Sequence, residues 1–111
     1  MLGASAWGVL SHVLLMRGKK DDALSAALEG KRLFDQTGGV VDGESLFRLA
    51  YAEALHAAGR TDDARAAIDD ARRRLHERAD RIEDPRWRRQ FLEEIREHAR
   101  TLECARLWLT G

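Results

Sequence analysis

The chain has little of several residue types that mark particular classes of protein. Its 111 residues include one cysteine, one proline and only 6% aromatic residues. Because Cys104 stands alone, it excludes both an internal disulfide and a cysteine-rich zinc site. The formal net charge is zero, since 19 basic residues balance 19 acidic ones. Nucleic-acid binders and proteins on anionic membranes normally carry a basic excess, so we expect neither partner.

A long hydrophobic run is also lacking. The apolar start, from Met1 to Met16, is too short for a membrane-spanning helix, which needs about 20 apolar residues. A secretory signal carries positive charge before its apolar region, whereas Arg17, Lys19 and Lys20 follow this one. We therefore expect a cytoplasmic protein.

What the sequence does have favours a single all-α domain. Hydrophobic residues make up 44% and charged residues 34%, a mixture typical of globular chains. Alanine, leucine, arginine and glutamate dominate, and all four are good helix formers. The pair Val40 and Val41 is too short and too closely bounded by glycine to predict a strand.

Apolar residues recur every three or four positions, which predicts helices over residues 4–17, 20–34, 44–58, 62–82 and 85–109. Residues 35–43 form the longest expected loop. Asp42 and Thr61 are expected to cap the helices that follow them, and Asp84 with Pro85 is typical of a helix start. The apolar pattern of the last segment weakens near Arg96, so that segment forms either one helix or two.

The faces of the first two helices differ in side-chain size. In the first, Trp7, Leu10 and Leu14 share one face, which we expect to contact the second helix. In the second, Ala23, Ala27 and Gly30 form a stripe of small residues that permits close approach of a neighbouring helix. Val41 and Leu46 are spaced to form a hydrophobic staple at the start of the third.

A short internal repeat is the most informative pattern. The hexapeptide that starts at Gly18 (GKKDDA) matches the one that starts at Gly59 (GRTDDA), 41 positions later. Each copy lies between two predicted helices. Helix pairs that recur at a fixed spacing are typical of an α-solenoid, in which each pair buries a face against the next.

The repeated segments resemble the tetratricopeptide repeat (TPR) family over residues 4–82. In the first copy the residues at the family's positions are Trp7, Leu10, Ser11, Leu14, Gly18, Ala23, Ala27 and Gly30. In the second they are Arg48, Tyr51, Ala52, Leu55, Gly59, Ala64, Ile68 and Ala71. Arg48 replaces the usual tryptophan, and the closing proline is absent from both copies. The family period is about 34 residues, so we place the extra residues in the 35–43 loop.

The resemblance implies two repeats, 4–34 and 44–82, followed by a capping region at 85–109. This last region, with Ile82–Pro85, Arg89, Phe91–Leu92 and Ala99–Leu102, is similar to the end of tetratricopeptide-like arrays in large bacterial signalling proteins. The resemblance therefore implies a non-catalytic protein-interaction or self-association module, at the C-terminal end of a larger bacterial signalling or regulatory protein.

The family binds protein segments in a groove lined mainly by the first helix of each repeat. Mapped onto this sequence, the expected partner groove is formed by Ser5, Gly8, His12, Leu15, Leu49, Glu53 and His56. Some members hold a peptide carboxylate with Lys, Asn and Arg, but Gly8, His12, Leu46 and Ala50 stand at those places here. We therefore do not expect a carboxylate clamp.

The sequence gives little evidence for catalysis or metal binding. The alternative function is a small helical metal-binding protein or enzyme that uses His12, Glu53 and His56, because Glu53 and His56 lie one turn apart. Such sites need several motifs of this kind, so we predict no metal, no cofactor and no catalytic residue. His76 and His98 are expected at the surface, and Cys104 as a small buried hydrophobe.

Arginine clusters at 72–74 and 86–89 are interleaved with acidic residues at one-turn spacing. Pairs of this kind stabilise a solvated helix face by about 0.2–0.5 kcal/mol each. The clusters therefore predict a charge-paired surface, not a nucleic-acid site.

The first helix carries a second apolar stripe, formed by Ala6, Val9, Val13 and Met16. A terminal repeat needs a polar outer face, so this stripe should be covered. Either a preceding repeat of a longer chain or a second copy of this one would cover it. For the isolated chain we predict a homodimer.

Overall fold

Helix-forming sequence continues through nearly the whole chain, and the fold is all-α as expected. The computed structural model describes residues 3–38 and 43–110, and no strand forms within them. Its helices are α1 (Ala4–Met16), α2 (Lys20–Gln36), α3 (Glu44–Ala57), α4 (Thr61–Asp80), α5 (Pro85–Glu93) and α6 (Arg96–Leu109). The expected segment at 85–109 is thus two helices, broken just before Arg96. None of the helices in these ranges is long and apolar enough to cross a membrane.

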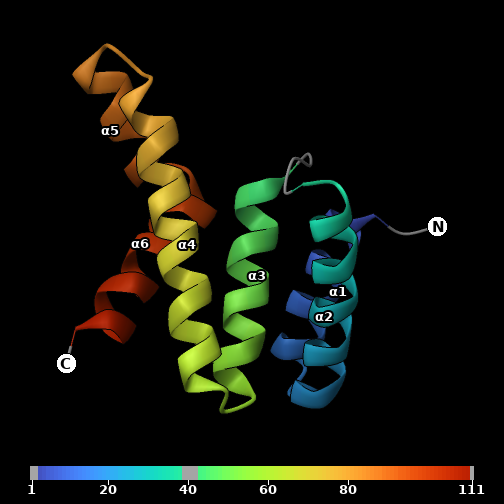
Figure 1. Ribbon diagram of the computed structural model, residues 1–111. Coiled ribbons are helices and arrows are strands. Elements are labelled where there is room, and N and C mark those ends of the chain that lie inside the picture. The colour runs from blue at the N-terminus through green and yellow to red at the C-terminus, as the bar shows by residue number, and fades with distance from the viewer. Residues whose placement is uncertain (1–2, 39–42, 111) are drawn as a thin grey trace.

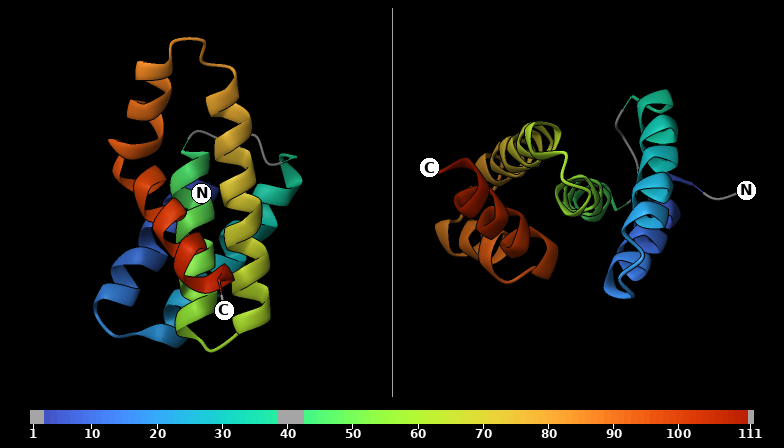
Figure 2. Two further views of the ribbon diagram at one scale, coloured as in Figure 1. Left: turned by 90° about the vertical axis from the view of Figure 1, so that its left-hand side faces the viewer. Right: turned by 90° about the horizontal axis from the view of Figure 1, so that it is seen from below.

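The helices are arranged around α3 (Figure 1). The pair α1 and α2 packs on one side of α3, and α4 packs on the other. From α4 the chain continues through α5 and returns as α6, which contacts both α3 and α4. Seen along the helices, α3 lies between the α1–α2 pair and the C-terminal helices (Figure 2).

The two matching hexapeptides form matching turns. Gly18 and Gly59 both have positive φ, 77° and 80°, which a residue without a Cβ adopts at little cost. The next residue closes each turn: Lys19 N donates to Leu14 O at 2.9 Å, and Arg60 N donates to Leu55 O at 3.0 Å. The alanines that end the hexapeptides, at 23 and 64, are both fully buried. The repeat in sequence is therefore a repeat in local structure.

Small residues bring α1, α2 and α3 close together. A Cβ added at Gly30 would lie 2.7 Å from Phe47 Cε1 and 2.9 Å from Trp7 Cβ, as the small-residue stripe predicts. The buried residues of α1 are Ala4, Gly8 and Ser11, and Ser11 Oγ donates to Ala23 O of α2 at 2.7 Å.

The predicted contact face of α1 is wrong in part. Leu10 is 38% exposed, while Trp7 and Leu14 are half-buried. The close packing of Ala4, Gly8 and Ser11 turns a face of small residues, not of large ones, toward α2 and α3.

Within the described residues, two hydrophobic clusters lie in the core. One joins Ala4, Phe34 and Phe47, with the rings of Phe34 and Phe47 stacked at 5.0 Å between centroids. The other lies where α3, α4 and α6 meet, and it contains Leu49, Ala52, Ile68, Cys104 and Ala105. Cys104 is fully buried, which confirms its assignment as a core residue.

The predicted N-terminal cap is confirmed for α5 and is wrong for α4. Asp84 caps α5 by accepting a hydrogen bond from Arg86 N at 2.8 Å, and Pro85 is the first helical residue. Thr61 does not cap α4: it is already helical, because Ala64 N bonds to Arg60 O and extends the helix by one residue. The expected cap at Asp42 and the staple from Val41 lie outside the described residues.

His98 was predicted at the surface, but it is buried. Its Nδ1 lies 2.8 Å from Phe91 O, a geometry in which the ring nitrogen donates. Its ring also packs against the Phe91 ring, with 4.4 Å between centroids. Because the chain reverses between α5 and α6, the side chain of His98 is turned into the junction between the two helices.

The arginine run of α4 forms the charge-paired face that its spacing predicts. Asp69 pairs with both Arg72 and Arg73, and Arg74 Nη1 lies 3.5 Å from Glu77 Oε2. Arg74 also reaches α3, with its Nε 3.2 Å from Glu44 Oε2. Arg88 instead donates to backbone oxygens, including Ile82 O at 2.6 Å.

Candidate functional site

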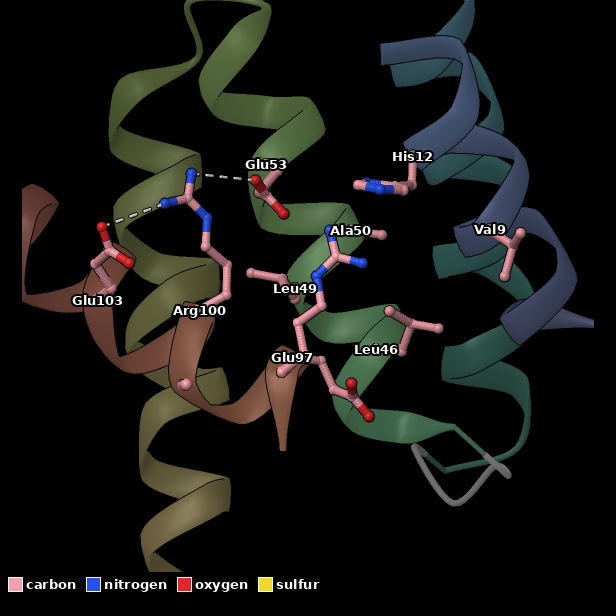
Figure 3. Close-up of a pocket in the computed structure, with 11 residues that line it drawn as sticks. Val9, His12, Leu46, Leu49, Ala50, Glu53, Glu97, Arg100 and Glu103 are labelled. Carbon is pink, nitrogen blue, oxygen red and sulfur yellow. Dashed lines mark ion pairs between the residues drawn. The ribbon is translucent and has the colours of Figure 1, made fainter. Parts of the chain in front are cut away.

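A groove of about 560 Å³ lies between α1, α3 and α6 (Figure 3). Its apolar lining comes from all three helices and consists of Val9, Leu46, Leu49, Ala50 and Ala99. Charged and polar side chains surround that lining, namely His12, Glu53, Arg96, Glu97, Arg100 and Glu103. An apolar floor with a polar rim is typical of a surface that binds another molecule.

Helix periodicity explains why these side chains meet. On α3, Leu46, Ala50 and Glu53 recur at intervals of four and three, which places them on one face. Val9 and His12 are three apart on α1 and face them from across the groove (Figure 3). The α6 residues belong to the groove because α6 returns along α3 after the break that follows α5.

One arginine ties the third wall to α3. Arg100 Nη2 lies 3.5 Å from Glu53 Oε2, and its Nη1 lies 3.6 Å from Glu103 Oε1 (Figure 3). The Glu53 side chain is only 18% exposed, so this pair is partly shielded from solvent. Glu53 thereby links α3 to α6, and its carboxylate is not left as an isolated charge.

The structure brings together some of the predicted groove residues and separates others. His12, Leu49 and Glu53 line the groove. Gly8 is buried against Phe47 and Ser5 lies against Gly43, and neither residue lines the groove. Leu15 is half-buried outside the lining. The His56 ring stacks in parallel on Trp108 with 4.1 Å between centroids.

Sequence reasoning missed the wall that α6 contributes. The residues Arg96, Ala99, Arg100 and Glu103 do recur at intervals of three, one and three, which marks one helix face. That signal shows that they share a face, but not which neighbour the face meets. Leu46 and Ala50, which the sequence did not place among the expected groove residues, form part of the apolar floor.

The three residues of the alternative metal site do not converge. His56 is stacked on Trp108, and Glu53 pairs with Arg100. Across the part of the chain that the structure describes, no group of three or more His, Cys, Asp or Glu could hold a metal ion.

Cys104 is placed as a packing residue and not as a nucleophile. It is fully buried between α3, α4 and α6, and this burial raises the pKa of its thiol to about 11. A thiol with so high a pKa carries almost no thiolate, the reactive form, at neutral pH.

A second hollow, of about 520 Å³, lies beside α2, α3 and α4 and is mostly polar. Its four cations are paired with carboxylates: Lys31 with Asp35 at 2.6 Å, Arg73 with Asp70, and both Arg48 and Arg74 with Glu44. These pairs leave little charge for a ligand, so the groove between α1, α3 and α6 is the better candidate site.

An exposed apolar ridge adjoins the groove. The predicted stripe on α1 is solvent-exposed: Val9 is 49% exposed, Val13 39% and Met16 75%. Ala6 at its start is exposed as well. Val9 belongs both to this α1 ridge and to the groove wall, so the two features form one continuous surface.

Comparison with models of protein families, with curated proteins and with solved structures finds no match to this chain.

Proposed function

We propose that this chain is a non-catalytic protein-interaction module of tetratricopeptide type, which holds a protein segment in the groove between α1, α3 and α6. The observation that carries this proposal is the groove itself. Its floor is apolar, its rim carries both signs of charge, and it adjoins the exposed α1 ridge. Exposed apolar surface rimmed by polar residues is characteristic of protein-binding sites.

The assignment to the tetratricopeptide type is supported by the matching turns. Both helix pairs close with a positive-φ glycine, the same backbone hydrogen bond and a buried alanine. In that family the first helix of each repeat lines the binding groove, and here α1 and α3 both do so. The groove is short, because only two such pairs contribute, and α6 extends it on one side.

The groove suits a segment that presents two or three apolar side chains. Each large apolar side chain that becomes buried contributes about 1.5–3 kcal/mol. The charges on the rim contribute less to affinity, because they are exposed, but they fix the orientation of the bound segment. No feature of the lining favours the metal-dependent alternative.

The test is selection of peptides from a displayed random library, followed by measurement of their dissociation constants. We expect enriched peptides with apolar anchors. Leu46→Glu places a charge on the groove floor and should weaken their binding by about tenfold or more, equivalent to about 1.4 kcal/mol. Leu28→Glu is the matched control, since Leu28 is 41% exposed on α2 and lies outside the groove lining.

Peptides that bind equally well to wild type and Leu46→Glu would contradict the proposed site. Failure to select any peptide with an apolar anchor, from a library that yields binders to a known control domain, would contradict the proposed function.

A further inference from the structure

The exposed α1 ridge has a counterpart in α3. The 41-residue offset between the two hexapeptides also relates the helices around them: α1 ends at Met16 and α3 at Ala57, while α2 begins at Lys20 and α4 at Thr61. Applied to the ridge, this offset gives one residue of α3 for each ridge residue. The pairs are Ala6 with Phe47, Val9 with Ala50, Val13 with Ala54, and Met16 with Ala57.

The two sets of residues differ in their exposure to solvent. All four ridge residues are exposed, whereas Phe47, Ala50 and Ala54 are buried and Ala57 is half-buried. Both sets are apolar, so their composition does not account for the difference. The neighbours do: α3 has the α1–α2 pair packed against it, whereas within the described residues α1 contacts only α2 and α3.

The contacts of Phe47 and Ala50 show what covers such a face. The Phe47 ring stacks on Phe34 of α2, and it occupies the space beside Gly30, where a Cβ would lie 2.7 Å from Phe47 Cε1. Ala50 Cβ lies 3.7 Å from the place of a Cβ at Gly8 of α1. The face of α3 is therefore covered by both helices of the preceding pair, at positions that lack side chains.

A second copy of the chain does not offer this covering surface. Its Gly8 and Gly30 lie against its own α3, where Phe47 fills the space beside both of them. A partner with the same kind of surface must therefore be another protein, with a helix pair whose small-residue face is free. In a helical-repeat protein each pair contacts only its neighbours, so the last pair of an array has one face free.

We propose that the α1 ridge docks the last helix pair of another helical-repeat protein, in the register in which α3 docks on α1 and α2. Ala6 then takes the place of Phe47, and Val9 and Val13 take the places of Ala50 and Ala54. The partner carries small residues on both helices of that pair. This inference goes beyond the proposed function, because it concerns the ridge and not the occupant of the groove.

The test uses a single-chain form of such a complex, in which residues 1–43 are joined directly ahead of residues 3–111. The added copy of α1 and α2 then stands 41 positions before the original. Urea denaturation should show one transition, with a higher midpoint than that of the unextended chain. Its slope should be larger in about the ratio of the chain lengths, because a docked pair unfolds with the rest. The midpoint and slope of the unextended chain would overturn the inference.

Val13→Lys in the original α1 tests the contact itself. It should lower the midpoint of the extended protein by about 0.5 M urea or more, because it places an unpaired charge in the contact. It should leave the unextended chain nearly unchanged, since Val13 is exposed there. Leu107→Lys, at an exposed apolar position of α6, is the control and should act equally in both proteins. An equal effect of Val13→Lys in both proteins would overturn the inference.

Ala6→Phe in the original α1 tests the register. The new ring should fill the space beside Gly30 of the added copy, as Phe47 does beside the original Gly30. We therefore expect a higher midpoint in the extended protein and no rise in the unextended one. The absence of a rise in the extended protein would overturn the register.

Sedimentation equilibrium tests the other possible occupant of the ridge. We expect the extended protein not to associate through its original ridge, because the added pair covers it. An extended protein that forms a dimer broken by Val13→Lys in the original α1 would show that a second copy covers the ridge instead, and would overturn the inference.

Discussion

Gly30 shows how a single residue controls the packing of three helices. Its missing side chain lets Phe47 of α3 and Trp7 of α1 approach α2 within van der Waals distance. This role could be predicted from the sequence, because Gly30 continues a stripe with Ala23 and Ala27 at helical spacing. The neighbours that fill the space could not, since they come from distant parts of the chain.

Gly30→Ala should therefore destabilise the protein despite a better helix propensity. Alanine gains about 1 kcal/mol over glycine within a helix, but overpacking typically costs about 1–3 kcal/mol. A Cβ here would clash with the base of Trp7 and with a packed aromatic ring, neither of which moves easily. We expect a net loss of about 1 kcal/mol in the free energy of unfolding, measured by urea denaturation. Ser25→Ala, at an exposed position of the same helix, should not destabilise; a more stable Gly30→Ala protein would refute this packing account.

Cys104 gives the stability a defined dependence on alkaline pH. Burial raises the pKa of its thiol from 9.0 to about 11 in the folded state. The resulting stability is fully present below pH 9, the unfolded pKa, and is lost as the pH rises toward 11. Since one pKa unit corresponds to about 1.4 kcal/mol, the loss is about 2–3 kcal/mol.

Denaturation at several pH values from 8 to 11, about the range that these pKa values span, measures this loss. Cys104→Ala supplies the comparison, because it retains the other alkaline groups and lacks the thiol. We expect the wild type to lose more stability than the variant over this range. Parallel curves for the two proteins would show that burial does not suppress thiol ionisation.

At the scale of helices, local sequence predicts most of what is seen. The helices, the repeated glycine turns and the start of α5 at Asp84 and Pro85 each depend on residues close together in the sequence. All three predictions are confirmed. The start of α4 was missed by one residue, because the turn at Gly59 already supplies the carbonyl of Arg60 as the first helical acceptor. The choice between one and two C-terminal helices depended on longer-range contacts, including the burial of His98 against Phe91.

The cap of α5 is the helix end most open to experiment. No residue of α5 is buried, so local interactions such as the hydrogen bond from Arg86 N to Asp84 should contribute a large share of its stability, beside the contacts of Phe91 and Arg88. Asp84→Ala should cost about 1 kcal/mol of local helix stability. Hydrogen exchange should then accelerate in α5 and remain unchanged in α1–α3. Glu83→Ala is the neighbouring control; equal exchange in the two variants would contradict the role of the cap.

At the scale of the whole molecule, the groove exists because α6 returns along α3. Sequence resemblance pointed to α1 and α3 as the lining helices, and three of the seven predicted positions, His12, Leu49 and Glu53, lie there. The α6 wall depends on the chain reversal before Arg96 and on the pairing of Arg100 with Glu53, which no local pattern specifies. The α1 ridge was predicted because the first helix carries a second apolar stripe besides its contact face, which is more apolar surface than one buried face requires.

The most direct test of the groove as a protein-binding site is an amide chemical-shift titration of the wild-type protein with a selected peptide. We predict shifts concentrated at Leu46, Leu49, Ala50, Ala99 and Arg100, with little change on α2 or on the arginine face of α4. Shifts confined to those outer faces, or no shifts at saturating peptide, would contradict the account.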